Sequence, residues 1–139
     1  MAHTVEQIMT RDPRTVDATG TIADAARTMR DGDIGDVVVV DGGEVSGIVT
    51  DRDIVIRAVA DGRDPESTKV ADVCTTGVET IEPGASVDDA VRLMRENDVR
   101  RLPVTENGRP VGIISLGDLA VEREPDSALA DISAASPDQ

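Results

Sequence analysis

The chain has 139 residues and a formal net charge of −14 at pH 7, because 28 acidic residues stand against 14 Lys and Arg. It contains no Phe, Trp or Tyr, one Cys and one His. The acidic balance and the absence of aromatic rings argue against a nucleic-acid partner, which needs clustered basic side chains and surfaces that stack on bases. One cysteine and one histidine exclude an internal disulfide, a His/Cys zinc site and a histidine-based catalytic triad.

Residues 1–6 lack the basic and apolar regions of a signal peptide. No apolar run approaches the roughly 18 residues that a membrane helix needs. The lone Cys74 is also typical of a reducing compartment. We therefore expect a cytoplasmic protein without a membrane partner.

The sequence repeats itself after 65 residues. Residues 8–56 align with residues 73–121 without a gap, and thirteen of the 49 aligned positions are identical. A twofold repeat of this length is not a solenoid, which needs three or more units. It predicts two similar units related by a pseudo-dyad.

Each repeat predicts the same elements in the same order. A strand at Thr15–Val16 precedes a helix capped by Thr21, whose apolar stripe is Ile22, Ala25, Ala26 and Met29. Strands at 37–40 and 45–49 follow, joined by a Gly-Gly turn, and a second helix opens at Thr50 with Ile54, Val55 and Ala58 apolar.

The second repeat predicts a strand at Thr80–Ile81, a helix capped by Ser86, strands at 102–105 and 110–114, and a helix from Ser115. Because proline donates no ladder hydrogen bond, Pro103 is expected at a strand end or on a sheet edge. The fold class is thus α+β, with two β-α-β-β-α units packed through their sheets. The predicted organisation is a first unit at 5–62, a linker at 63–69, a second unit at 70–121 and an acidic tail at 122–139.

A hydroxyl and a carboxylate recur at each junction between a strand and the second helix. The motif Gly47-Ile48-Val49-Thr50-x-x-Asp53 matches Gly112-Ile113-Ile114-Ser115-x-x-Asp118. A carboxylate there can accept hydrogen bonds from a vicinal diol, and the hydroxyl can reach a phosphate or a ribose oxygen. The same residues also form ordinary helix-capping pairs, so the motif alone leaves both interpretations open.

The tandem Gly-apolar-apolar-Thr/Ser-x-x-Asp pattern resembles a pair of cystathionine-β-synthase (CBS) domains, also called a Bateman module, over about residues 5–121. The segment 50–56 is most similar to small stand-alone bacterial pairs of the hypoxic-response type. This resemblance implies a cleft between the units with two pseudo-equivalent sites, frequent dimerisation, and adenine nucleotides or S-adenosylmethionine as ligands.

The resemblance also implies roles for individual residues. Asp53 and Asp118 match the ribose-binding acids, and Thr50 and Ser115 match the hydroxyls near ribose or phosphate. The backbone of Thr15, Val16, Thr80 and Ile81 matches positions that line the adenine. Arg100 and Arg101 match phosphate-binding positions, and the strand with Leu102 and Pro103 matches one that packs on the base.

The first repeat departs from this pattern. It has Asp36 where the second has Arg101, which disfavours a phosphate there by like-charge repulsion, although Arg52 could compensate. The overall negative charge further favours AMP or a weakly charged adenosine ligand over ATP.

No base, nucleophile or metal set stands out, so we expect no catalysis and no obligatory cofactor. The leading hypothesis is a homodimeric regulatory module that binds AMP, ADP, ATP or S-adenosylmethionine and signals to an unidentified effector protein. The alternative is a ligand-free interaction or stress-response protein that uses the same fold as a scaffold.

Overall fold

The computed structural model describes residues 4–123, and for residues 121–123 the backbone alone. The chain divides into two compact units. The middle unit is Arg14–Val78, and the composite unit joins residues 4–13 to residues 79–123. Most of the predicted acidic tail, residues 124–139, lies outside the described residues.

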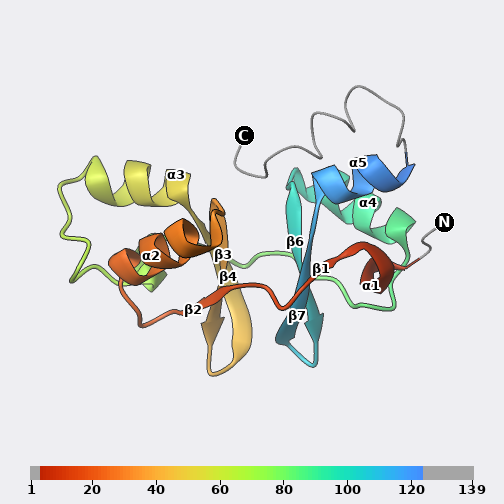
Figure 1. Ribbon diagram of the computed structural model, residues 1–139, viewed down its shortest axis with the longest axis horizontal. Helices are drawn as coiled ribbons and strands as arrows, with labels where there is room; N and C mark the ends of the chain where they lie inside the picture. The colour runs from red at the N-terminus through yellow and green to blue at the C-terminus, as the bar shows by residue number, and fades with distance from the viewer. Residues whose placement is uncertain (1–3, 124–139) are drawn as a thin grey trace. The chain divides into compact units, whose positions relative to one another are not determined.

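The middle unit is built on a mixed sheet with the strand order β2-β3-β4-β5. Its strands are β2 (Thr15–Asp17), β3 (Asp36–Asp41), β4 (Glu44–Thr50) and β5 (Thr75–Thr76). Strand β2 runs parallel to β3, and the other pairs are antiparallel. Helices α2 (Ile22–Gly32) and α3 (Asp51–Ile54) lie on the same side of this sheet (Figure 1).

The composite unit has the sheet order β1-β7-β6. Its elements are α1 (Val5–Ile8), β1 (Thr10–Arg11), α4 (Val87–Asn97), β6 (Arg101–Glu106), β7 (Arg109–Ser115) and α5 (Leu116–Arg123). Helices α4 and α5 share one side of the sheet (Figure 1). The two units therefore repeat one plan, as the alignment of the sequence with itself predicts.

Helices α2 and α4, which occupy equivalent places in the two units, begin as predicted. Thr21 Oγ1 accepts a hydrogen bond from Asp24 N at 3.1 Å, and Thr21 N donates to Asp24 Oδ2 at 3.2 Å. Ser86 Oγ accepts from Asp89 N at 3.0 Å. The buried stripe differs from the prediction in one place, because Ala26 is exposed and Ala23 is buried instead.

The second helix of the middle unit widens after one turn. Residues Val55–Val59 form a π-helix, η1, in which Ala60 N donates to Val55 O at 2.9 Å. Ala58 is fully buried as expected, but Val55 is 56% exposed. The wider turn changes which side chains face the core, so the prediction that Val55 lies on the apolar face is wrong.

Each unit includes a short segment that precedes the other unit's repeat in the sequence. The pair α1–β1 packs in the composite unit, where Thr10 pairs with Ile113. The aligned segment, the 3₁₀ turn η2 (Val70–Asp72) and β5, packs in the middle unit, where Thr76 pairs with Gly47. Residues 63–69, expected as a linker, also pack there: Ile22 N donates to Thr68 O at 2.9 Å, and Thr68 is 6% exposed.

These added strands explain the glycine of the repeated motif. A Cβ atom on Gly47 would collide with the carbonyl oxygen of Thr75 on β5. A Cβ atom on Gly112 would collide with the Met9 side chain and lie 3.0 Å from Thr10 O. Glycine at this position therefore lets a neighbouring strand approach β4 or β7 closely.

Candidate functional site

The end of β4 forms the first candidate site, which we call the middle corner (Thr50 and Asp53). Thr50 N donates to Asp53 Oδ2 at 3.0 Å, and Asp53 N donates to Thr50 Oγ1 at 3.0 Å. The two side chains thus cap α3 reciprocally. This arrangement fixes a hydroxyl and a carboxylate side by side where the strand becomes a helix.

The end of β7 repeats the arrangement in the composite corner (Ser115 and Asp118). Ser115 N donates to Asp118 Oδ2 at 2.9 Å, and Asp118 N donates to Ser115 Oγ at 3.1 Å. All four corner side chains are half-buried. The predicted pairs therefore come together in both units.

The remaining carboxylate oxygens have different surroundings. Asp53 Oδ1 lies 3.9 Å from Arg57 Nε, and Arg57 Nη1 donates to Val73 O at 3.1 Å. Among the residues whose side chains are described, Asp118 Oδ1 has no hydrogen-bond or ion-pair partner. The contact from Arg57 was not predicted, although its i,i+4 spacing from Asp53 is the signal that could have revealed it.

The corners lie on the face of each sheet opposite the helices. In the middle unit, Val37, Val39 and Val49 belong to the core under the helices. Side chains alternate along a strand, so Asp36, opposite Thr50, points to the other face. Next to this pair on the same face stand Val38 and Ile48, which are also directly opposite each other.

The composite unit places equivalent residues in the same way. Leu102, Val104 and Ile114 belong to its core, and the intervening pairs are Arg101 with Ser115 and Pro103 with Ile113. Each corner is thus followed by an apolar pair, in which Val38 or Pro103 is fully buried and Ile48 or Ile113 is half-buried. Ile48 and Ile113 are candidate contacts that the sequence did not single out, because their role depends on the register of the strands.

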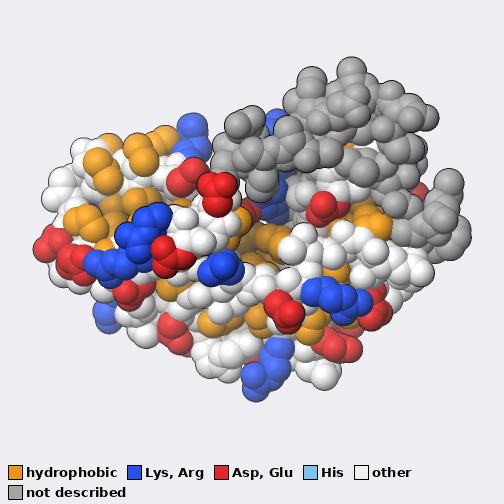
Figure 2. All heavy atoms as spheres, in the orientation of Figure 1, with side chains coloured by type: hydrophobic (Ala, Val, Ile, Leu, Met, Phe, Trp, Pro, Cys, Tyr) orange, Lys and Arg blue, Asp and Glu red, His pale blue; other side chains and the backbone are white. Residues whose placement is uncertain are grey.

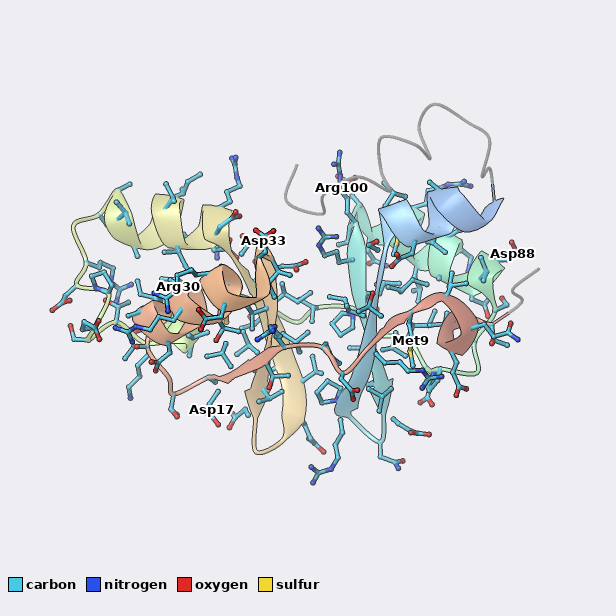
Figure 3. All side chains as sticks on the ribbon, viewed as in Figure 1. Met9, Asp17, Arg30, Asp33, Asp88 and Arg100 are labelled. Atoms are coloured by element: carbon cyan, nitrogen blue, oxygen red, sulfur yellow. The ribbon has the colours of Figure 1, made fainter. Side chains whose placement is uncertain are left out.

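The charges around the two corners differ. In the middle corner, Asp36 lies directly across from Thr50 and Arg57 lies beside Asp53, while Asp51 and Arg52 come between the two corner residues in the sequence. In the composite corner, Arg101 lies directly across from Ser115, and Leu116 N donates to the carbonyl oxygen of Arg100 at 2.7 Å. The Arg100 side chain is exposed and extends away from the start of β6 (Figure 3).

The other predicted residues divide between the surface and the core. Thr15, Thr80 and Arg52 are exposed, and Arg101 is half-buried. The side chains of Val16, Ile81 and Leu102 lie in the cores under the helices. The role predicted for Val16 and Ile81 involves only their backbone, and Leu102 points to the face opposite Arg101.

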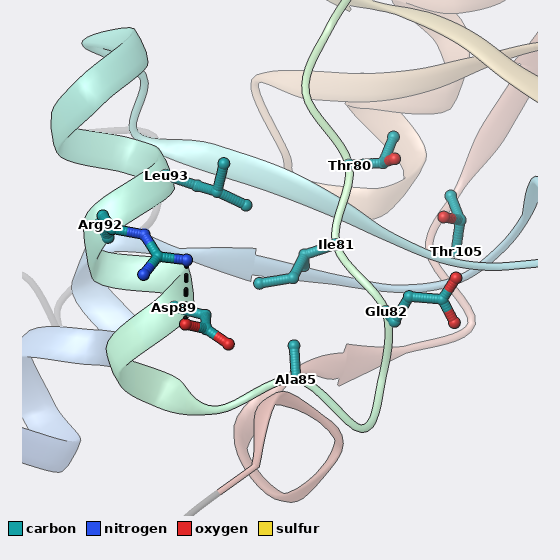
Figure 4. Close-up of a pocket in the computed structure, with 8 residues that line it drawn as sticks. All are labelled: Thr80, Ile81, Glu82, Ala85, Asp89, Arg92, Leu93 and Thr105. Atoms are coloured by element: carbon teal, nitrogen blue, oxygen red, sulfur yellow. Dashed lines mark ion pairs between the residues drawn. The ribbon is translucent and has the colours of Figure 1, made fainter.

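A cavity of about 390 Å³ lies beside the composite sheet (Figure 4). It is lined by Thr80, Ile81, Glu82, Ala85, Asp89, Arg92, Leu93 and Thr105. Arg92 and Asp89 form an ion pair of 3.1 Å at its wall. The cavity includes two predicted residues, Thr80 and Ile81, and neither residue of the composite corner.

Cys74 lies next to β5 and is 8% exposed. Burial raises the pKa of its thiol, and the negative charge of Asp53 adds to the rise. Within residues 4–123, no group of three or more His, Cys, Asp or Glu side chains could hold a metal ion. In the same range, every helix is too short or too polar to cross a membrane.

Comparison with known proteins shows which family has this arrangement. The CBS domain family matches residues 5–59 and 70–123. The chain belongs to the CBS domain family. The predicted resemblance to a tandem CBS pair and the predicted α+β fold class are therefore confirmed.

Several tandem CBS proteins are similar over most of their length. The CBS domain-containing protein YhcV of Bacillus subtilis is 40% identical over 133 residues, covering 93% of this chain and 94% of YhcV. Hypoxic response protein 1 of Mycobacterium tuberculosis is 34% identical over 118 residues, covering 84% and 82%. A solved structure from Burkholderia ambifaria, described as a candidate signal-transduction protein with CBS domains, has a TM-score of 0.77 and 36% identity over 89% of this chain and 96% of that one. Stand-alone CBS proteins of this kind are typically non-catalytic regulatory modules.

Proposed function

We propose that this CBS pair is a regulatory module that binds an adenosine compound, such as AMP, ADP, ATP or S-adenosylmethionine, at its two corners and signals to a partner protein. The observation that carries the proposal is the repeated corner: a fixed hydroxyl and carboxylate followed by an apolar pair on the helix-free face of each sheet. A carboxylate can accept both hydroxyls of a ribose, and an apolar pair suits the face of a base.

A second function is supported by one observation. Both corners are satisfied as capping boxes without any ligand, which is what a ligand-free scaffold protein would need. A capping residue stabilises a protein by about 1 kcal/mol on its own. The two functions therefore differ in whether Asp53 and Asp118 also bind a ligand in addition to capping a helix.

The chain contains a matched control that separates these functions. Thr21 and Asp24 form the same reciprocal capping box at the start of α2, away from the corner motif. The test is calorimetry with AMP, ADP, ATP and S-adenosylmethionine on the native chain and on Asp53→Asn, Asp118→Asn and Asp24→Asn. Asparagine keeps a capping acceptor and removes the charge.

We expect Asp53→Asn and Asp118→Asn each to weaken binding at its own corner by about tenfold or more, the cost of losing a charge-assisted hydrogen bond. Asp24→Asn should leave ligand affinity unchanged while changing the melting temperature as much as the corner variants do. If the native chain binds none of the four compounds at millimolar concentration, the scaffold function replaces the regulatory one.

We further propose that the chain forms a homodimer through η1. Val55, Ile56 and Val59 are 56%, 48% and 59% exposed, which is unusual for large apolar side chains on one short segment. Figure 2 shows hydrophobic side chains gathered over this part of the middle unit. Sedimentation analysis should give a dimer for the native chain and a monomer for Ile56→Glu; a native monomer would contradict this assembly.

A further inference from the structure

We propose that the acidic tail docks on α4 of the composite unit, where the Asp131 carboxylate pairs with Arg92 and the neighbouring tail residues cover the cavity beside the composite sheet. The segment 63–69 makes the equivalent contact with α2 in the middle unit. The inference concerns a surface outside the corners, so it does not depend on the proposed binding of adenosine compounds.

In the middle unit, the segment 63–69 lies along the first half of α2. Ala23 N donates to Pro65 O at 3.1 Å. The carboxylate of Glu66 forms an ion pair with Arg27, in the middle of the helix. This helix is therefore held from outside by a stretch of chain that supplies both a carbonyl and a carboxylate.

The composite unit repeats the arginine without an outside carboxylate. Arg92 aligns with Arg27, and it lies 3.1 Å from Asp89 as Arg27 lies 3.3 Å from Asp24. Its second acidic neighbour, Glu96 at 3.9 Å, belongs to α4 as well. Among the described residues, no carboxylate from another element pairs with Arg92. Its side chain is 63% exposed, compared with 49% for Arg27.

The cavity next to Arg92 opens where a strand is lost. In the middle unit, Ala18 N donates to Val40 O at 2.8 Å beyond the end of β2. The aligned residues of the composite unit are Pro83 and Thr105, and proline has no N–H to donate. Thr105 lines the cavity and is 7% exposed, and its hydroxyl makes no hydrogen bond to any described residue. The cavity thus contains a buried polar group that a docked backbone could satisfy.

The charge of the tail suits this surface. The tail follows α5, which packs against α4 as α3 packs against α2. Residues 1–3 align with residues 66–68 but contain no carboxylate. The tail contains four beyond α5: Glu124, Asp126, Asp131 and Asp138. It is therefore the segment that can supply the carboxylate that Glu66 supplies to α2.

The length of the tail selects one of these acids. Continued into the tail, the 65-residue offset aligns Asp131 with Glu66. Eight residues lead from Ala58 to Glu66, and eight lead from Arg123, which aligns with Ala58, to Asp131. Because equal lengths of chain leave equivalent positions in the two units, Asp131 can span the same path to Arg92.

The apolar residues of the tail suit the cavity. Three apolar side chains of its lining point toward one another (Figure 4): Ile81, Ala85 and Leu93. The tail carries Leu129 and Ile132 on either side of Asp131, where the segment 63–69 has the polar residues Asp64 and Ser67. Burial of these two side chains against the cavity would favour docking.

Paramagnetic broadening in NMR spectra of the full chain tests the proposal. A spin label is attached at Ser133→Cys in a chain that also carries Cys74→Ser. The broadening of backbone amides is compared between α4 and α2. Arg92→Gln removes the proposed partner, and Arg95→Gln, which is exposed on the same helix, is the matched control. Asp131→Asn and Asp126→Asn form a second matched pair within the tail.

We expect the label to broaden the amides around Arg92 and in residues 82–85 more strongly than those around Arg27. Arg92→Gln and Asp131→Asn should each lower the ratio of docked to undocked tail about threefold, the effect of losing one exposed ion pair. Arg95→Gln and Asp126→Asn should leave this ratio unchanged. The ratio should also fall at 1 M salt, where the screening length is about 3 Å.

Equal broadening of α2 and α4 overturns the docking. So does a broadening of α4 that Arg92→Gln and Arg95→Gln reduce alike, or that Asp126→Asn reduces as much as Asp131→Asn, because the tail would then be attracted by overall charge and not by one pair.

Discussion

Val38 and Pro103 occupy equivalent places in the two units, yet the strands next to them differ. Val38 N donates to Arg14 O at 3.2 Å, and the neighbouring segment is a regular parallel strand, β2. Pro103 has no N–H, and the equivalent segment of the composite unit is reduced to a single bridge between Ile81 and Val104. Pro103 is buried in β6, the edge strand of its sheet. Ile81 N donates to the Pro103 carbonyl, and the proline nitrogen, which has no hydrogen to donate, faces the same side.

The comparison shows that the two units keep the hydrogen bonds of their corners although a neighbouring strand and the nearby charged side chains differ. The corners keep the same hydrogen bonds within about 0.1 Å in both units, while the side chains around them change charge. Shape is thus maintained in both units, and the electrostatic surroundings vary. The following variants probe which differences matter.

The largest effect is expected from Gly47→Ala. Its Cβ atom would meet the rigid backbone carbonyl of Thr75, so β5 must shift away from β4. We expect a loss of about 3 kcal/mol in the free energy of unfolding, at the upper end for overpacking. Gly112→Ala should cost less, because the Met9 side chain that it meets can move. Urea denaturation of both variants measures the difference, and equal losses would show that the close approach of β5 is not the cause.

Val38→Pro should make the middle unit resemble the composite unit. The substitution removes the hydrogen bond to Arg14 O and leaves that carbonyl without its donor, at a cost of about 2 kcal/mol. Hydrogen exchange should show that amide protection falls in β2 and persists in β4. If protection in β2 is unchanged, the proline does not explain the missing strand of the composite unit.

Removing the corner hydroxyls should affect the two units alike. Thr50→Ala and Ser115→Ala each lose one capping acceptor, so each should lower the free energy of unfolding by about 1 kcal/mol, as should Thr21→Ala at α2. Thermal denaturation without ligand measures this. A much larger loss at one corner would mean that its hydroxyl supports more than the helix start.

The smallest effect is expected at the Cys74 thiol. The aligned residue of the other repeat is Met9, which has no ionisable group. Because burial raises the pKa of the Cys74 thiol above the ordinary value of 9.0, the folded protein holds this proton more tightly than the unfolded chain does. The resulting stabilisation is fully present below pH 9.0 and is lost as the pH rises through the folded pKa. Iodoacetamide labelling at pH 8 should therefore be slow.

Asp53→Asn removes one negative charge that raises the pKa of this thiol, so labelling should become faster. Asp24→Asn is the control, because Asp24 is not among the charges that shift the thiol. Equal labelling rates in the two variants would show that the charge of Asp53 does not reach Cys74.

Local sequence signals predicted much of this structure. The hydroxyl-x-x-acid pairs marked the starts of α2, α3, α4 and α5. Gly-Gly and Asn-Gly marked both hairpins, where Gly42, Gly43, Asn107 and Gly108 adopt positive φ. The internal repeat predicted two similar corners. These features depend on residues within a few positions of one another, so they can be recognised before the fold is known.

Other features required the tertiary structure. The exchange of the segments 4–13 and 69–78 between units, the π-helical turn at Val55–Val59 and the contacts of Gly47 and Gly112 all depend on residues that are distant in sequence or on the exact pitch of a helix. The sequence alone determined which chemical groups stand at each helix start and that they occur twice. Only the tertiary structure decided that Arg101 faces Ser115 while Asp36 faces Thr50, because the register of two strands is fixed by the packing of their buried faces over the whole sheet.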